Sequence, residues 1–304
     1  MAELNLRQMR YAIAMADHGT ISGAARALDL TQPALSGSLR ELESALGVTL
    51  FVRARGRALT PTAEGRVLLP EIRRLVADAL DVEQRAQGLV APSTGTVRVG
   101  SLVTVAPILL APLLRAFRDE HPSAGLGVTT GDQQALLAGL GTGDLHMALT
   151  YDLDIDEGIE FVPIADVPPK VLLPSSHPLA SRRSIRLDAL RDEPFVLLDL
   201  PLSADYFQAV FLAAKVSMRP ALRCSDLGFV RSLVAEHMGF SVVNLVPSSR
   251  GDDGLAYVSI DGDVPTLRLG FAMSDRPLPP VASAFRDIAT TLLPRLLRTR
   301  ANRR

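Results

Sequence analysis

A stripe of leucines at helical spacing marks the segment around which the amino-terminal part of the chain is organised. Thr31 has the position of an N-cap, and Pro33 falls in the first helical turn, where its missing N–H costs no hydrogen bond. The leucines that follow, three or four residues apart, are Leu35, Leu39, Leu42 and Leu46. The opposite face is short and polar, and it holds no acid before Glu41. This pattern predicts an amphipathic helix with a small polar outer face.

A shorter helix is predicted directly before this one. Ser22 can cap a segment that carries Ala24, Ala25 and Leu28, and only residues 29–31 separate the two helices. Two helices joined by a tight turn, the second presenting Gln, Ser and Arg, describe a helix-turn-helix whose second helix enters the major groove of DNA. Spacing alone leaves an ordinary alanine-rich helical hairpin equally open.

Further elements complete a compact head. Residues 4–17 read as a first helix that ends at Gly19. Its expected core positions are Leu6, Met9, Ile13 and Ala16. Two β-prone runs, 48–52 and 58–60, flank the arginine-rich segment 53–57. They predict a hairpin, or wing, whose arginines contact phosphates or a narrow minor groove, against the alternative of a solvated turn.

A long helix with a narrow apolar seam follows the wing. Thr62 can cap it, and the pattern continues to about Leu89, with Pro70 near its start. Its apolar positions alternate steps of four and three residues: Leu68, Ile72, Leu75, Ala79, Val82, Ala86 and Leu89. Such a heptad seam is typical of a helix that pairs with a second helix, so we expect Leu68, Ile72, Leu75, Ala79 and Val82 to form a dimer interface. The segment 91–95 then breaks the chain as a hinge.

After the hinge, predicted strands and helices alternate. The first expected run is 96–101 (strand), 106–119 (helix), 126–130 (strand), 133–140 (helix) and 145–151 (strand). This βαβαβ order predicts a mainly parallel sheet with helices on both faces. Strands at 159–164 and 171–174 lead towards a second unit, where 195–198, 204–214, 221–224, 229–237 and 241–245 alternate again. A strand at 266–274 is expected to return to the first sheet before a closing helix at 281–297.

Composition narrows the possible classes. The chain has 304 residues, 47% of them apolar, which is enough for two or three compact units. Its formal net charge is −1, and residues 1–66 hold eight Arg against six acids, a net of +2 that is only weak evidence for DNA. Arg7 and Arg10 interrupt the first apolar run, and no uninterrupted apolar window reaches about 18 residues, so we expect a cytoplasmic protein without a signal peptide or membrane span.

Cys224 is the only cysteine, which excludes a disulfide within one chain and agrees with a reducing compartment. A redox-sensor role is disfavoured because such a sensor usually needs a resolving partner.

The segment from Thr20 to Arg53 resembles the amino-terminal signature of the LysR-type transcriptional regulators. The matching residues are Thr20-Ile-Ser, Ala24-Ala25, Leu28, Leu30-Thr-Gln-Pro-Ala-Leu-Ser36, Leu39, Leu42-Glu43, Leu46-Gly47, Leu50-Phe51 and Arg53. The likeness continues through Leu59-Thr-Pro-Thr-Ala-Glu-Gly65, and the remainder of the chain resembles that family's effector-binding domain. Gly37 departs from the pattern, because the family usually has a basic residue there. A phosphate or base contact expected at this position is therefore absent.

The resemblance implies an α/β protein with an N-terminal winged helix-turn-helix at 1–61, a long linker and dimerisation helix at 62–90, and a C-terminal two-lobed periplasmic-binding-protein-like α/β domain. This effector-binding domain, 91–304, would have lobe I at 91–166 and 267–304 and lobe II at 167–266. The implied function is sequence-specific DNA binding that regulates transcription and is modulated by a small molecule between the lobes. The implied partners are double-stranded DNA, an unidentified small organic effector, further copies of the chain in a dimer or dimer of dimers, and RNA polymerase. No cofactor or metal is expected.

The expected DNA contacts lie on the two helices and the wing. They are Ser22, Thr31, Gln32, Pro33, Ser36, Arg40, Arg53, Arg55 and Arg57. Gln32 and Ser36 are expected to read base edges, and the arginines of the wing to contact the backbone or the minor groove.

The expected effector contacts lie at strand ends and helix starts, because a ligand of a bilobal α/β fold sits there. They are Ser101, Leu102, Thr104, Thr130, Gly131, Asp132, Tyr151, Asp199, Pro201, Ser203, Asp226 and Phe229. Helix amino termini with Ser and Thr favour an anion, whereas the three Asp residues favour an amine or a hydroxyl-bearing ligand. Each Asp is also readily explained as a plain N-cap, so these residues do not decide the charge of the ligand.

Other classes of protein find less support. The five histidines show no zinc-ligand pair at i, i+3 or i, i+4, and the chain has neither a Gly-x-Ser-x-Gly elbow nor a GxxxxGK[ST] phosphate loop. The glycine-rich segment 139–143 follows a helix and reads as a helix stop. A periplasmic-type carrier would not need the helical head, and an α/β enzyme would need a catalytic constellation. We therefore expect a regulator that is not an enzyme.

Overall fold

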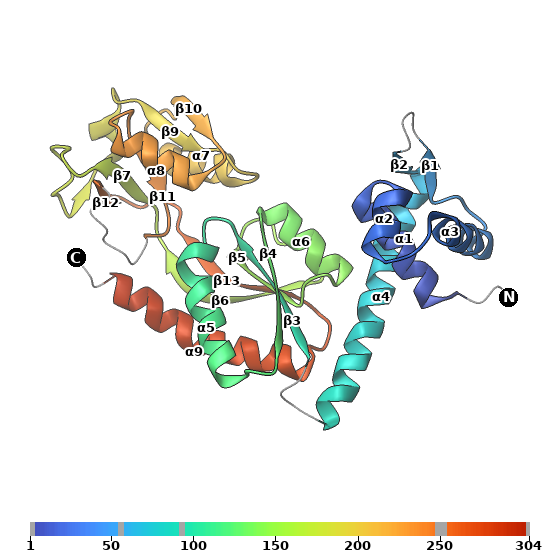
Figure 1. Ribbon diagram of the computed structural model, residues 1–304. Helices are drawn as coiled ribbons and strands as arrows, with labels where there is room; N and C mark the ends of the chain where they lie inside the picture. Colours follow the sequence, from blue (N-terminus) through green and yellow to red (C-terminus); the bar gives the residue numbers. More distant parts are fainter. Residues whose placement is uncertain (1–3, 54–57, 91–94, 247–253, 302–304) are drawn as a thin grey trace. The chain divides into compact units, whose positions relative to one another are not determined.

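The computed structural model describes residues 4–53, 58–90, 95–246 and 254–301. Contacts divide the chain into two compact units, Met1–Pro92 with Gly141–Asp144, and Ser93–Leu140 with Leu145–Arg304. The first unit is helical with one small hairpin, and the second holds two groups of strands flanked by helices (Figure 1). The elements of the first unit are α1 (Leu6–His18), α2 (Ile21–Ala27), α3 (Gln32–Leu46), β1 (Phe51–Arg53), β2 (Leu59–Pro61) and α4 (Ala63–Val90).

The starts of α2 and α3 are capped by threonine hydroxyls. Thr31 Oγ1 accepts a hydrogen bond from Ala34 N at 3.4 Å, which confirms the predicted N-cap of α3. The predicted cap of α2 was wrong: Thr20 Oγ1 accepts from Gly23 N at 3.0 Å, and Ser22 lies inside the first turn. Thr20 takes the cap because its backbone is extended there, the conformation that an N-cap requires.

The core of the first unit forms where α1, α2, α3 and α4 meet. Leu35, Leu39 and Leu42 are buried, as the leucine stripe predicted. The face of α1 agrees with the prediction in part, because Met9 is buried and Ile13 and Ala16 are half-buried against the core. The buried residues of α1 are Met9, Ala12 and Met15, while Leu6 is exposed. Because Leu6 stands at the first turn of α1, the helix extends past the core at that end.

The wing is tied to α3 and α4. Strands β1 and β2 pair antiparallel, which confirms the predicted hairpin. Glu43 Oε1, on α3, accepts from Leu50 N at 2.7 Å just before β1. Thr62 Oγ1 accepts from Gly65 N at 2.8 Å, as expected of the N-cap of α4, and donates to Thr49 O at 2.7 Å. These bonds fix the base of the hairpin against both helices.

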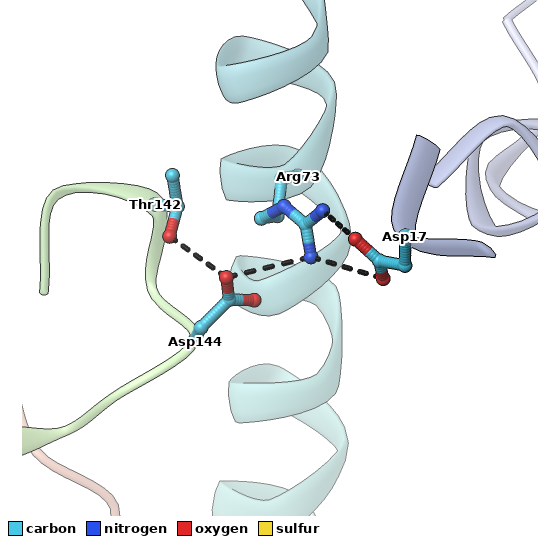
Figure 2. A network of polar contacts seen from close by, with 4 residues as sticks. All are labelled: Asp17, Arg73, Thr142 and Asp144. Atoms are coloured by element: carbon cyan, nitrogen blue, oxygen red, sulfur yellow. Dashed lines mark hydrogen bonds and ion pairs between the residues drawn. The ribbon is translucent and has the colours of Figure 1, made fainter. Parts of the chain in front are cut away.

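Helix α4 runs unbroken through Pro70 and buries one face in the first unit. Leu69, Ile72 and Val76 belong to the core of that unit. Arg73 projects from the same helix (Figure 2). Its guanidinium donates to both carboxylate oxygens of Asp17 at the end of α1, and its Nη1 lies 3.4 Å from Asp144 Oδ2. Burial lowers the pKa of Arg73, but the hydrogen bond with Asp17 and the charge of Asp144 raise it, and the net shift is upward. The charged pair therefore joins α1 to α4.

The second unit contains two groups of strands. The first group comprises β3 (Thr96–Leu102), β4 (Gly125–Gly131), β5 (Met147–Tyr151), β6 (Ile159–Val167) and β13 (Leu267–Ser274), with η1 (Ala106–Leu110), α5 (Ala111–Glu120), α6 (Gln133–Thr142) and α9 (Pro280–Ala301). The second comprises β7 (Lys170–Pro174), β8 (Ser184–Ile185), β9 (Phe195–Leu198), β10 (Pro220–Cys224), β11 (Ser241–Val243) and β12 (Leu255–Ile260), with η2 (Leu187–Leu190), α7 (Ser203–Ala213) and α8 (Leu227–Ala235). We refer to these groups as lobe I and lobe II.

The sheet of lobe I has the strand order β4-β3-β5-β13-β6. Strands β4, β3 and β5 are parallel, as predicted, and β13 returns to this sheet antiparallel to both β5 and β6. In Figure 1, α5 and α9 cover one face and α6 the other. Phe117 and Phe285 join α5 to α9 with ring centroids 5.1 Å apart. The helix predicted at 106–119 is divided, because its first turn is the π-helix η1.

Lobe II is more mixed than the predicted alternation of strands and helices. Strands β9 and β10 are parallel, and a second sheet has the order β11-β7-β12-β8. The bridge between Phe195 and Phe240 links the two sheets. Strands β8 and β12 were not predicted, although the run Leu255–Ile260 has the residue types of a strand.

At two glycines in helices of the first unit, a methyl group is expected to have opposite effects on stability. A Cβ at Gly65 would lie 2.1 Å from Leu50 O, whereas a Cβ at Gly37 would have nothing within 4 Å. We expect Gly65→Ala to lower the free energy of unfolding by about 1–3 kcal/mol and Gly37→Ala to raise it by about 0.5–1 kcal/mol. Urea denaturation of both variants checks this, and equal effects would contradict the packing described here.

Candidate DNA interface and ligand cavity

The outer face of α3 is polar and exposed at its start. Gln32, Pro33 and Arg40 are exposed and Ser36 is half-buried, while the first turn contains no acid. The acids further along the helix are engaged within the unit, since Glu41 accepts from a glutamine of α1 at 2.7 Å and Glu43 accepts from the wing. Because the leucines hold the inner face in the core, this polar face is the one available to another molecule.

The structure describes some of the other predicted DNA contacts in full and others in part or not at all. Ser22 is exposed in the first turn of α2, and Thr31 is the exposed cap of α3. Arg53 belongs to β1, but its side chain, like all of Arg55 and Arg57, lies outside the described residues. Exposed helix starts present backbone N–H groups that suit phosphate oxygens.

The predicted seam of α4 is divided between two environments. Ile72 is buried in the core of its own unit, and Leu68 packs against that core. Leu75 and Val82 are instead 48% and 58% exposed, and Ala79 is half-buried. The part of the seam that is open to a second helix is therefore shorter than predicted, because Leu68 and Ile72 pack inside their own unit.

A cavity of about 70 Å³ lies between lobe I and lobe II. From lobe I it is lined by Leu102, Thr104, Asp132, Gln133, Tyr151, Leu153 and Leu267. From lobe II it is lined by Leu198, Leu200, Pro201, Ser203, Tyr206, Phe207, Leu227, Val243, Asn244 and Leu245. The lining is mostly apolar with a few polar groups, which is the usual composition of a small-molecule site.

Two phenols lie in this lining. Burial raises the pKa of Tyr206 to about 12, partly offset by its hydrogen bond with Asn244. Burial also raises the pKa of Tyr151. Repulsion from Tyr206 in its ionised form adds to this increase, and a hydrogen bond with Thr104 opposes it. Tyr206 Oη donates to Pro265 O at 3.0 Å and accepts from Asn244 Nδ2 at 2.7 Å. Both side chains are thus neutral near pH 7.

The structure brings half of the predicted effector residues to the cavity. Those in the lining are Leu102, Thr104, Asp132, Tyr151, Pro201 and Ser203. Ser101 is fully buried in the sheet of lobe I, and Phe229 is 57% exposed on α8. Asp226 is the N-cap of α8 and accepts from Phe229 N at 2.6 Å. Asp199 pairs with Arg223 at 3.2 Å. Thr130 and Gly131 end β4 and are not among the lining residues.

Sequence reasoning missed most of the lobe II side of the cavity. Val243, Asn244 and Leu245 stand at the end of a predicted strand, so the rule that ligands sit beyond strand ends would have found them. Tyr206 and Phe207 lie inside α7, where a core position and a cavity position have the same pattern in the sequence.

Family comparison identifies the class of protein. Residues 6–66 match the bacterial regulatory helix-turn-helix protein, lysR family, and residues 91–294 match the LysR substrate binding domain. The chain belongs to the LysR family of transcriptional regulators. It is a DNA-binding transcriptional regulator with an effector-binding domain of the periplasmic-binding-protein-like fold, and its family consists of regulators.

Individual relatives agree with this assignment. The chain is 26% identical to the DNA-binding transcriptional dual regulator OxyR of Escherichia coli over 96% of each chain. Among solved structures it is similar to HinK, a LysR family transcriptional regulator from Pseudomonas aeruginosa (28% identity, 96% and 100% coverage, TM-score 0.63). Full-length CbnR complexed with its target DNA shares the fold (24% identity, 95% and 99% coverage, TM-score 0.68).

Two structural features are absent from the described residues. None of their helices combines the length and apolar character needed to cross a membrane. No group of three or more His, Cys, Asp or Glu side chains among them is arranged to hold a metal ion.

Proposed function

We propose that this regulator reads its operator with the outer face of α3 and the wing, pairs with a second copy through the exposed side of α4, and responds to a small organic molecule in the cavity between the lobes. The observation that carries the proposal is the orientation of α3. Its leucines are buried, and the polar residues expected to contact DNA face outward without a free acid in the first turn. A helix turned in this way can enter a major groove without electrostatic repulsion from its leading end.

Side chains on this face suit the two kinds of DNA contact. Gln32 can pair with adenine through two hydrogen bonds, and Arg40 can bond a phosphate or guanine. Ser22, Thr31, Pro33 and Ser36 would line the same surface, with Arg53, Arg55 and Arg57 supplying wing contacts. Bound beside a promoter in the cytoplasm, where the bacterial chromosome lies, the protein would act on RNA polymerase.

Removal of single contacts tests the DNA interface. Gln32→Ala should weaken binding to the preferred operator by about 1–3 kcal/mol and relax sequence preference, because a base contact is lost. Arg40→Ala should weaken binding to all sequences and reduce the salt slope by about 1. The measurement is fluorescence anisotropy with DNA selected by the chain itself from a random pool. Arg115→Ala, on α5 with its side chain 81% exposed, is the matched control and should leave affinity unchanged. Unaltered binding by both α3 variants would contradict the proposed interface.

Pairing through α4 would place the exposed residues Leu75 and Val82 against a second copy, with Ala79 between them. A dimer of this kind, or a dimer of dimers, would hold two α3 helices at the spacing of two half-sites. Burying this strip in a partner also removes apolar surface from water.

A charge on this strip tests the pairing. Leu75→Glu should destabilise the dimer by about 2–4 kcal/mol, because two carboxylates would be desolvated against each other. Sedimentation velocity should then show smaller species. Leu212→Glu, which changes a 72% exposed leucine on α7, serves as control. An unchanged mass distribution for Leu75→Glu would show that α4 does not form the interface.

A bulky side chain in the cavity tests the effector site. A compound that stabilises the wild type in a thermal-shift screen should no longer do so in Leu200→Trp, because the indole would fill the cavity. At about 100 times its Kd, such a compound contributes roughly 2.7 kcal/mol to the wild type. Leu212→Trp should keep the full shift, and both variants should keep operator affinity. An equal shift in Leu200→Trp would place the site elsewhere.

A further inference from the structure

We propose that the cavity takes a small, uncharged, largely apolar molecule that donates a hydrogen bond, such as an alcohol or phenol, and rejects carboxylates, phosphates and amines. This inference rests on the function proposed above, in which the cavity is the effector site. It concerns the chemical class of the ligand, which membership of the family does not determine.

The charge of the lining disfavours an anion. Among the described residues that line the cavity there is no Lys, Arg or His, and Asp132 is the one acidic residue. A carboxylate or phosphate that left water for this cavity would lose its hydration without gaining a cationic partner. The acidic residue of the lining, Asp132, has a charge of the same sign.

Three of the helix starts near the cavity are also unfavourable for an anion. A helix amino terminus attracts anions through its free N–H groups and its dipole. Three of these starts already have a carboxylate of the chain nearby, whereas the start of η1, just after Thr104, has no acid in its first turn. Asp132 Oδ1 accepts from Ala135 N at 2.9 Å at the start of α6, Asp226 caps α8, and Asp205 lies in the first turn of α7. An anion would therefore meet repulsion at all three positions.

Most of the hydrogen-bond donors of the lining are engaged by the protein. The two hydrogens of the Gln133 amide go to the carbonyls of Tyr151 and Leu153 at 2.9 and 2.6 Å. Those of Asn244 go to a backbone carbonyl at 2.9 Å and to a phenol oxygen at 2.7 Å. The hydroxyl of Ser203 bonds to backbone groups at 2.7–2.8 Å. A ligand that only accepts hydrogen bonds would find few donors.

Acceptors, in contrast, remain available. Asn244 Oδ1 and Asp132 Oδ2 have no hydrogen-bond donor among the described residues, and both residues line the cavity. A ligand hydroxyl would satisfy either oxygen. An ammonium group would be attracted to Asp132, but the cost of desolvating it among mostly apolar residues, with no second carboxylate in the described lining, offsets that attraction.

The size of the cavity limits the ligand. Its volume of about 70 Å³ is roughly half that of the ~150 Å³ apolar cavity that holds benzene. By this comparison a molecule of about three heavy atoms fits with the lobes as they stand, and a four-carbon chain or an aromatic ring would require the lobes to separate.

Matched probes on two carbon skeletons test the proposal with the full chain. The four-carbon set is 1-butanol, butyrate, butylamine and 1-methoxypropane, and the aromatic set is benzyl alcohol, benzoate, benzylamine and anisole. In each set the ether is an isomer of the alcohol without its donor. In isothermal titration calorimetry, the alcohol of at least one set should bind at least ~10-fold more tightly than the other three members. Equal or tighter binding by the carboxylate, the amine or the ether overturns the inference, as does the absence of alcohol binding at about 10 mM.

Two aspartate variants locate the cause of the selectivity. Asp132→Asn keeps an N-cap residue while removing the charge, so the alcohol-to-carboxylate affinity ratio should fall by about 10-fold. Asp226→Asn makes the same change at a cap outside the lining and should keep the wild-type ratio. An unchanged ratio in Asp132→Asn would contradict the role given to its charge.

The cavity-filling variant separates this inference from the proposed function. If Leu200→Trp abolishes binding of a probe that is not the alcohol, the cavity is the ligand site and only the class is wrong. If the alcohol binds Leu200→Trp as tightly as the wild type, the alcohol does not bind in this cavity. In that case both the proposed ligand class of the cavity and its proposed role as the effector site are wrong. Operator binding, measured separately, bears on neither result.

Discussion

Burial of Leu35, Leu39 and Leu42 is the constraint on which the DNA-binding unit depends. A helix can bury only one face, so placing these side chains in the core determines which residues of α3 face outward. Each leucine contributes roughly 2–3 kcal/mol when it leaves water, which makes a rotated helix strongly unfavourable. The hydrogen bond from Leu50 N to Glu43 then places the wing relative to the same helix. The orientation of the polar surface is therefore a consequence of packing.

In the cavity between the lobes, hydrogen bonds within the protein determine which groups remain available to a ligand. The polar side chains of the lining mostly bond to the protein itself, as Gln133 does with two carbonyls and the hydroxyl of Thr150. Such internal bonds make the polar part of the lining rigid, because each broken bond would leave a buried group unsatisfied. What remains for a ligand is apolar surface and a few acceptors. Selectivity in a site of this kind comes from which hydrogen bonds the protein leaves unmade.

Much of the architecture could be predicted from the sequence, because local pattern determines it. The leucine stripe, the Thr31 cap and the returning strand β13 were predicted correctly from spacing and residue type. Errors arose where two residues carry the same local signal. Thr20 and Ser22 can both cap a helix, and only the path of the chain after α1 decides between them. Likewise, Ile72 fits both a heptad seam and a core stripe, and the structure gives it to the core.

The cavity was less predictable, because its lining comes from elements far apart in the chain. Strand ends and helix starts identified Leu102 and Asp132, since a general rule places ligands there. Tyr206 and Asn244 come together only through the fold of lobe II, which included strands that were not predicted. Asp199 and Asp226 illustrate the opposite error, in which a residue type that suits a ligand is already used for an ion pair and a cap.

Hydroxyl-radical footprinting of the full chain, free and bound to its operator, shows whether DNA covers the outer face of α3. We expect oxidation of Pro33 and Arg40 to fall on binding, because DNA would cover the outer face of α3. Phe229 and Met238, which are 57% and 49% exposed in lobe II, act as internal controls and should react as before. Unchanged oxidation at Pro33 and Arg40 together with protection of Phe229 and Met238 would show that DNA binds another surface, and would contradict the role proposed for α3.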